Sequence, residues 1–146
     1  MYDNIYKILA TNEDILSYFN IDPSAYDEDE GEKLLNDIAK RIHKRSKPPV
    51  VIGQLPIIAF YTPGGRRDSK NYNVYNTVIT FDIYTNDDVD QAQEIAELLD
   101  CIFNDTLVEL GVESMKGETK SEYESNSGLD NVYTYTKIMS IPVYIE

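Results

Sequence analysis

Residues 72–110 read YNVYNTVITFDIYTNDDVDQAQEIAELLDCIFNDTLVEL, and this stretch passes directly from a strand pattern into a helix pattern. In its first part apolar and polar side chains alternate, which predicts a strand with one buried face. That face carries Tyr75, Thr77, Ile79, Phe81 and Ile83, and the other carries Asn76, Thr80 and Asp82. In its second part apolar residues recur at helical spacing, which predicts a long helix. The apolar stripe of this helix comprises Val89, Ala92, Ile95, Ala96, Leu99, Phe103 and Leu107.

The residues around this helix indicate where it begins and ends. Thr85 or Asn86 precedes it, acidic residues occupy its first turns, and Gly111 follows it. Small polar side chains satisfy free N–H groups at a helix start, and glycine commonly ends a helix. We therefore expect Thr85 or Asn86 to be the cap.

An apolar run, LPIIAFYT at residues 55–62, lies before this strand and predicts another one. The two flank PGGRRDSKNYN, so we expect a long antiparallel hairpin with a flexible loop at residues 64–73. A phosphate-binding loop of the Walker type needs a lysine and a hydroxyl residue at fixed offsets, and it leads into a helix. This loop lacks both residues at those offsets, and it leads into a strand. It is either a solvated hairpin end or a surface that contacts a partner.

The C-terminal part predicts a second strand pair. A nearly all-polar strand within residues 112–125 is expected at a sheet edge, and NSGLDN is expected to form a turn. The last strand has one apolar face. Its Pro142 fits an edge strand or the end of a strand. That face consists of Tyr133, Tyr135, Met139, Ile141 and Val143.

The N-terminal part predicts helices. Ile5, Ile8 and Leu9 share one helical face, and Thr11 or Asn12 can cap a second short helix. Residues 22–33 are expected to form a flexible loop. From about Glu32 an amphipathic helix is expected, with a basic end and with two prolines at 48 and 49 to stop it. Its apolar stripe comprises Leu34, Leu35, Ile38, Ala39 and Ile42.

These elements predict one domain over residues 1–146. The fold class is α+β, a mostly antiparallel sheet with helices packed on one face, in the order α-α-β-β-α-β-β. No apolar stretch is long enough for a membrane span, and the N-terminus lacks the pattern of a secretory signal. We therefore expect the protein to be made in the cytoplasm.

Charge is distributed unevenly along the chain. The formal net charge is −13, yet no acidic residue lies between Asp37 and Asp68. A protein this acidic is not expected to bind nucleic acid nonspecifically. Separate basic and acidic surfaces do favour a head-to-tail contact between identical copies. The basic residues expected to make partner contacts are Lys40, Arg41, Lys44, Arg45, Arg66, Arg67 and Lys70.

Few residues indicate chemistry. His43 is the only histidine, which removes most metal and triad constellations, and it is expected to be solvated. Cys101 has no disulfide partner and is expected to be a small buried hydrophobe. The acidic run at residues 27–32 places glycine one position away from that of a calcium-binding EF-hand loop. We therefore expect no catalytic residue, cofactor or metal, although a carboxylate-dependent hydrolase stays a weak alternative.

The succession of a strand, an acid-capped helix and a closing hairpin resembles that of bacteriophage tail terminator or tail completion proteins of long-tailed phages. The segments that carry it are NTVITFDIYTND, VDQAQEIAELLDCIF and YTKIMSIPVYI. The opening NIYKILATNEDILSYF and the run LPIIAFYT are similar to that family as well. The insert at residues 22–51 is longer than the segment that the family pattern has between the first helices and the first strand.

The resemblance implies a structural virion protein and no enzyme. Such proteins form a ring, usually of six copies, at the head-proximal end of the tail tube, where they stop tube polymerisation and join the neck. The implied partners are other copies of the chain, the tail tube protein and a head or neck connector protein. The position that matches the family's hairpin loop is Gly64–Asn73. Another head-tail joining component, or a small cytoplasmic binding module, is the alternative.

Overall fold

The computed structural model describes residues 2–46, 48–67, 74–105 and 117–144. Helices cover one face of a five-stranded sheet with the order β1-β2-β3-β5-β4, which confirms the predicted α+β class. Only β1 and β2 run parallel, and every other neighbouring pair is antiparallel. The strands are β1 Ile42–His43, β2 Ile57–Arg67, β3 Val74–Thr85, β4 Glu118–Ser125 and β5 Tyr133–Tyr144.

The β2–β3 hairpin is longer than the sequence pattern predicted. The pairing of β2 with β3 shifts register between Tyr61 and Gly64 and then continues to the pair Arg67↔Tyr75. Residues 64–67 are therefore strand, and the prediction that they begin a loop is wrong. The adjacent pair of glycines does not stop the strand, because a bulge absorbs the irregularity. The rest of the predicted loop, residues 68–73, lies outside the described residues.

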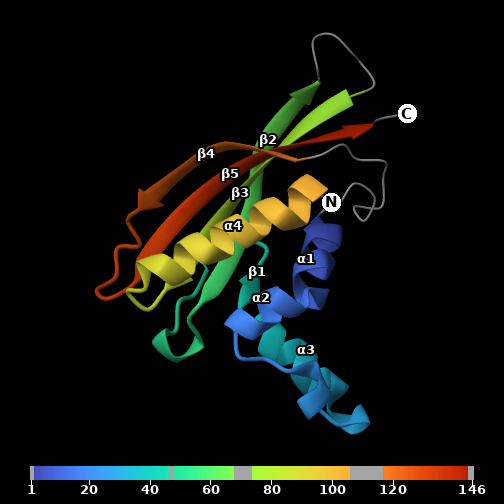
Figure 1. Cartoon of the computed structure of the whole chain (residues 1–146), viewed down its shortest axis with the longest axis vertical. Helices are drawn as coiled ribbons and strands as arrows, with labels where there is room; N and C mark the ends of the chain where they lie inside the picture. Colours follow the sequence, from blue (N-terminus) through green and yellow to red (C-terminus); the bar gives the residue numbers. More distant parts are fainter. Residues whose placement is uncertain (1, 47, 68–73, 106–116, 145–146) are drawn as a thin grey trace.

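In Figure 1 the helix α4 crosses the sheet, and among the described residues α1, α2 and α3 contribute side chains to the same core cluster as α4. Asn12 caps α2 as predicted, since its Oδ1 accepts a hydrogen bond of 3.0 Å from the backbone N–H of Ile15. Within the described part of the chain, no helix is long and apolar enough to cross a membrane. The helices are α1 Tyr2–Thr11, α2 Glu13–Tyr18, α3 Gly31–Ala39 and α4 Val89–Asp105.

The predicted element order matches the observed order only loosely, because the prediction left out one helix and the strand β1. The helix α3 ends at Ala39, well before the prolines, and residues predicted as its basic end enter the sheet instead. Ile42 is 2% exposed and pairs with Ile58, so burial of this side chain in a parallel ladder replaces another helical turn. Leu35, predicted to be on the apolar stripe, is 64% exposed.

The predicted loop at residues 22–33 contains regular turns. Two short 3₁₀ helices lie at Pro23–Ala25 and Glu28–Glu30, and α3 begins directly afterwards at Gly31. The side chain of Asp22 caps the first one by accepting a hydrogen bond from the N–H of Ser24 at 3.0 Å. The proline and the acidic residues therefore form helix starts here.

The core lies between α4 and the central strand β3. On the predicted apolar face of β3, Ile79, Phe81 and Ile83 are fully buried, and Ala92, Ile95, Ala96, Leu99 and Phe103 of α4 are buried against the sheet. Two predictions about α4 are wrong: Val89 is 42% exposed, and Cys101 is exposed. Cys101 follows Leu99 by two positions, which turns its side chain about 200° away from the buried stripe. Leu107 lies outside the described residues.

The N-cap of α4 is Asp88, and the prediction of Thr85 or Asn86 is wrong. Asp88 Oδ1 accepts a hydrogen bond of 3.0 Å from the N–H of Gln91. Thr85 contributes one step earlier, because its hydroxyl donates to the carbonyl of Asp88 and accepts from the N–H of the same residue. Thr85 thus shapes the turn that places Asp88 at the helix start.

Replacing the cap tests this assignment. Asp88→Ala is expected to lower the free energy of unfolding by about 1 kcal/mol, because one N–H group at the helix start loses its acceptor. The matched control Asn86→Ala is expected to change it by less than about 0.5 kcal/mol, since Asn86 is exposed. Urea denaturation followed by circular dichroism measures both. Equal losses in the two variants would contradict the assignment of the cap.

Candidate functional site

The basic residues predicted to contact partners lie along one edge of the sheet. Lys40, Lys44 and Arg45 are exposed around β1, and Arg66 and Arg67 stand at the far end of β2. Eight residues of β2 separate Ile58, beside β1, from Arg66, which is roughly 26 Å at the rise of a strand. The acid-free interval is therefore spread along β1 and β2, and we call this side of the sheet the basic edge.

Arg41 differs from its basic neighbours because its side chain turns inward. Its guanidinium lies 6.0 Å from the ring centroid of Phe19 and donates a hydrogen bond of 3.3 Å to the carbonyl of Leu55. Burial lowers the pKa of Arg41, and the nearby charge of Asp37 acts in the opposite direction. Arg41 thus joins the helices to the segment before β2 and offers little to a partner.

The remaining side chains near β1 are accessible. Lys40 lies 4.0 Å from a carboxylate oxygen of Asp37, and Lys44 Nζ lies 4.9 Å from the ring centroid of Tyr6. Exposed pairs of this kind contribute at most about 1 kcal/mol, and both side chains lie at the surface. Lys70 lies outside the described residues.

The opposite edge of the sheet, β4, is acidic. Its sequence ETKSEYES contains Glu118, Glu122 and Glu124 against a single lysine, Lys120, which lies 3.0 Å from Glu118. Most of its residues are exposed, and of the strands in the described ranges it pairs only with β5, which confirms the prediction that this polar strand is an edge. We call β4 the acidic edge.

A buried lysine attaches the acidic edge to the body of the protein. Lys137 of β5 is 0% exposed, and its ammonium contacts carboxylate oxygens of Asp100 on α4, at 3.1 Å, and of Glu122 on β4. Thr119 also donates a hydrogen bond to Asp100, and Tyr135 donates one to Glu122 at 3.2 Å. A lysine is almost never fully buried unless it is paired, and both partners here are carboxylates.

The sequence pattern alone does not identify this cluster. Lys137 interrupts the apolar face of β5 between Tyr135 and Met139, and that interruption was the available signal. Its two partners come from positions 15 and 37 residues away along the chain, in β4 and α4. Only the packing of α4 over β5 brings the three charges together.

A polar network occupies the sheet face that carries no helix. Thr136 donates a hydrogen bond of 2.7 Å to Asp82, and Ser125 lies 2.8 Å from the same threonine hydroxyl, to which it therefore donates. Burial raises the pKa of Asp82, although hydrogen bonds from Thr136 and Tyr61 lower it. Nearby, burial raises the pKa of Tyr84 to about 12, with the charge of Asp82 a smaller cause. The network links four strands through one carboxylate.

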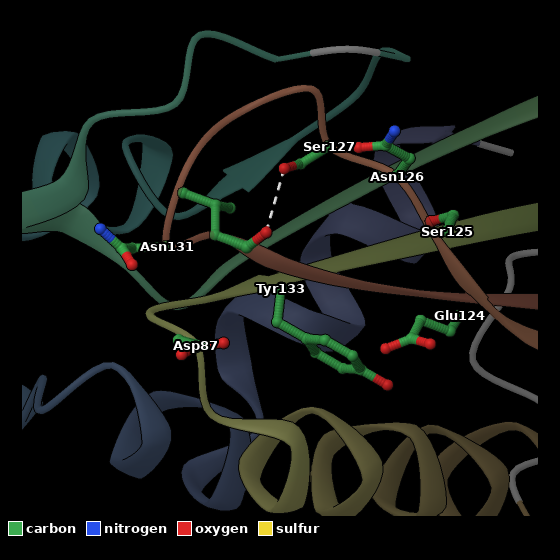
Figure 2. Close-up of a pocket in the computed structure, with 8 residues that line it drawn as sticks. Asp87, Glu124, Ser125, Asn126, Ser127, Asn131 and Tyr133 are labelled. Carbon is green, nitrogen blue, oxygen red and sulfur yellow. Dashed lines mark hydrogen bonds between the residues drawn. The ribbon is translucent and has the colours of Figure 1, made fainter.

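A depression of about 460 Å³ lies at the end of the acidic edge (Figure 2). Two carboxylates, of Glu124 and Asp87, stand at its sides, and Tyr133 lies between β4 and the start of α4. The turn after β4 is held by Ser127, whose hydroxyl donates to the carbonyl of Val132 at 3.0 Å. Burial raises the pKa of Tyr133, and the charge of Glu124 adds to that shift. None of the described residues that line this depression is a lysine or an arginine, so it extends the negative charge of β4.

The residues considered for chemistry do not come together. His43 is half-buried with Nε2 3.0 Å from the carbonyl oxygen of Lys40, and Cys101 lies on the exposed side of α4. In the described ranges, no group of three or more His, Cys, Asp or Glu side chains is arranged to hold a metal ion. The features that stand out are therefore surfaces, one at each edge of the sheet.

No protein-family model matches this sequence, and no curated protein matches it either.

Changing the Lys137 cluster tests its role in holding β4. Asp100→Asn combined with Glu122→Gln leaves a buried ammonium without a carboxylate, and it is expected to cost about 3–5 kcal/mol of unfolding free energy. Lys137→Met is expected to cost less, because the two carboxylates are about one-third exposed and can be hydrated. Urea denaturation compares the two variants. A larger loss in Lys137→Met would contradict this account.

Asp82 predicts a pH dependence with a defined sign. Because its pKa is raised in the folded state, its contribution to stability is present at low pH and is lost as the pH rises through the folded value. Asp82→Asn keeps an acceptor for Thr136 and carries no charge. The stability of this variant relative to the native protein is therefore expected to increase from pH 3 to pH 7. Denaturation at both pH values measures the difference, and a decrease would contradict the shift.

Proposed function

We propose that this chain is a structural virion protein of the tail terminator type. Copies of it form a ring, of six by the family pattern, at the head-proximal end of the tail tube of a long-tailed phage. The ring stops polymerisation of the tube and gives the head or neck connector protein a surface to join. Its partners are thus its own copies, the tail tube protein and the connector, and its synthesis takes place in the host cytoplasm.

The observation that carries the proposal is the reach of the β2–β3 hairpin. The strand β3 has twelve residues and extends about 40 Å, whereas the seventeen residues of α4 extend only about 26 Å. The paired strands therefore run past the helices that cover them, as Figure 1 shows. A hairpin that projects from a helix-covered sheet supports a role in contacts between subunits, and it matches the long hairpin implied by the resemblance.

The charge distribution also supports an assembly role. The strand β4 contains three glutamates and a single lysine, while the basic residues of the acid-free interval gather at the β1 and β2 side. A closed ring needs two different, complementary surfaces on each copy, because each copy contacts its neighbours head to tail. Strong net negative charge further suits a ring through which DNA passes without being held.

Assembly of purified protein tests the proposal. Native mass spectrometry and negative-stain microscopy are expected to show a ring, of six copies, either alone or on tail tubes. Tubes grown with the protein present are expected to carry it at one end and to stop elongating. A protein that stays monomeric in both settings and leaves tube growth unchanged would contradict the proposal. Binding to the connector alone would indicate a different head-tail joining component.

A variant at the hairpin separates assembly from folding. Arg66→Ala combined with Arg67→Ala removes two charges at the far end of β2 and is expected to reduce tube capping while the urea midpoint stays unchanged. Lys7→Ala combined with Lys33→Ala removes two exposed charges from helices and serves as the matched control. Equal tube capping by both variants would show that the end of the hairpin takes no part in the contact with the tube.

A further inference from the structure

We infer that neighbouring copies contact each other edge to edge, the acidic edge of one sheet facing the basic edge of the next. This inference deepens the proposed ring and rests on it. The partner is thus a second copy of this chain, and the surfaces are β4 on one side and β1 with the adjoining β2 on the other. It is carried by where the sheet order places the charges.

The sheet order puts the two charged strands as far apart as the fold allows. In the order β1-β2-β3-β5-β4, the strands β1 and β4 are the two ends of the sheet. Two such edges on one copy point in different directions, so one copy cannot satisfy both with itself. A contact between them joins copies head to tail, and such a heterologous contact closes into a ring when the rotation between copies permits.

The two edges carry opposite charge. Around β1 the exposed charged residues are Lys40, Lys44 and Arg45, whereas Arg41 turns inward, and segment 40–46 contains no acidic residue. The strand β4 contains three glutamates and one lysine. Glu118 and Glu124 are exposed, as are Lys40, Lys44 and Arg45, so these charges lie at the surface of the two edges.

Backbone hydrogen bonding adds a second reason for contact at these edges. Among the described strands β4 pairs with β5 alone, which leaves one row of its backbone groups without a partner in that part of the chain. On the other side, β1 covers only Ile58 and Ala59 of β2, and no other described strand pairs with β2 on that side. Exposed edges tend to pair with another chain, and the complementary charges select which edge each one meets.

The net charge of −13 does not prevent this contact. At physiological ionic strength the Debye length is about 8 Å, so repulsion between whole copies is largely screened. Ion pairs formed at direct contact lie well within that distance. The arrangement therefore favours the opposite-edge contact over a contact between two acidic edges, which would place like charges together.

Charge reversal at each edge tests the inference. The basic-edge variant is Lys44→Glu with Arg45→Glu, and the acidic-edge variant is Glu118→Lys with Glu124→Lys. Glu122 is left unchanged because it pairs with buried Lys137. Each variant alone is expected to self-associate at least about tenfold more weakly than the native chain, measured by sedimentation and native mass spectrometry.

Mixing the two variants gives the decisive measurement. The acidic-edge variant then has two basic edges, and the basic-edge variant carries two acidic residues next to β1, so alternating copies place opposite charges at the substituted positions. An equimolar mixture is expected to recover assembly. The matched control is Glu13→Lys with Glu97→Lys, which changes the net charge as much as the acidic-edge variant does but on exposed positions of α2 and α4. This control is expected to assemble as the native chain does.

The outcomes distinguish this inference from the proposed function. If rings form equally well with either variant alone, the edge contact is overturned and the proposed ring stands. The same conclusion follows if the mixture fails to assemble although the native chain does. A native chain that stays monomeric alone and with tail tubes would overturn both. The native chain could also assemble only on tubes. If both variants then still capped the tubes, the edges would have no role in assembly and the inference would be overturned. Circular dichroism and urea midpoints check that every variant is folded.

Discussion

The packing of Phe81 holds the two layers of this protein together. Its ring lies 6.2 Å from that of Phe60 on β2 and 5.5 Å from that of Phe103 on α4, in tilted arrangements that aromatic pairs favour. The strand that carries it, β3, pairs with β2 on one side and with β5 along its whole length on the other. Phe81 therefore joins the central strand, its neighbour β2 and the helix α4 within one buried cluster.

The surfaces follow from that central strand. Because β3 is paired on both sides, the edges of the sheet lie at β4 and at the β1 and β2 side, and the free backbone groups and the two sets of charged residues are found there. Lys137 then attaches the nearly all-polar β4, which has few apolar side chains to bury, through carboxylates on two different elements. The same sheet therefore has a buried apolar centre and two charged edges of opposite sign.

Much of the fold was predictable because β3 and α4 are long and strongly periodic. Alternation identified the buried face of β3, helical spacing identified most of the buried face of α4, and polarity identified β4 as an edge. The failures lie where a short element depends on a distant one. Ile42 and His43 form a strand only because β2 passes beside them, and Cys101 is exposed because its position on α4 turns away from the sheet.

By itself, the sequence determined the fold class, the hairpins, the apolar face of each long element and the acid-free interval. These properties depend on local periodicity and on composition, which the order of residues states directly. Only the tertiary structure decided that Lys137 meets Asp100 and Glu122, that Arg41 turns inward, and that the acid-free interval forms one edge of the sheet while glutamates line the other. Those arrangements depend on strand order and on the seating of α4, which bring together residues far apart in the chain.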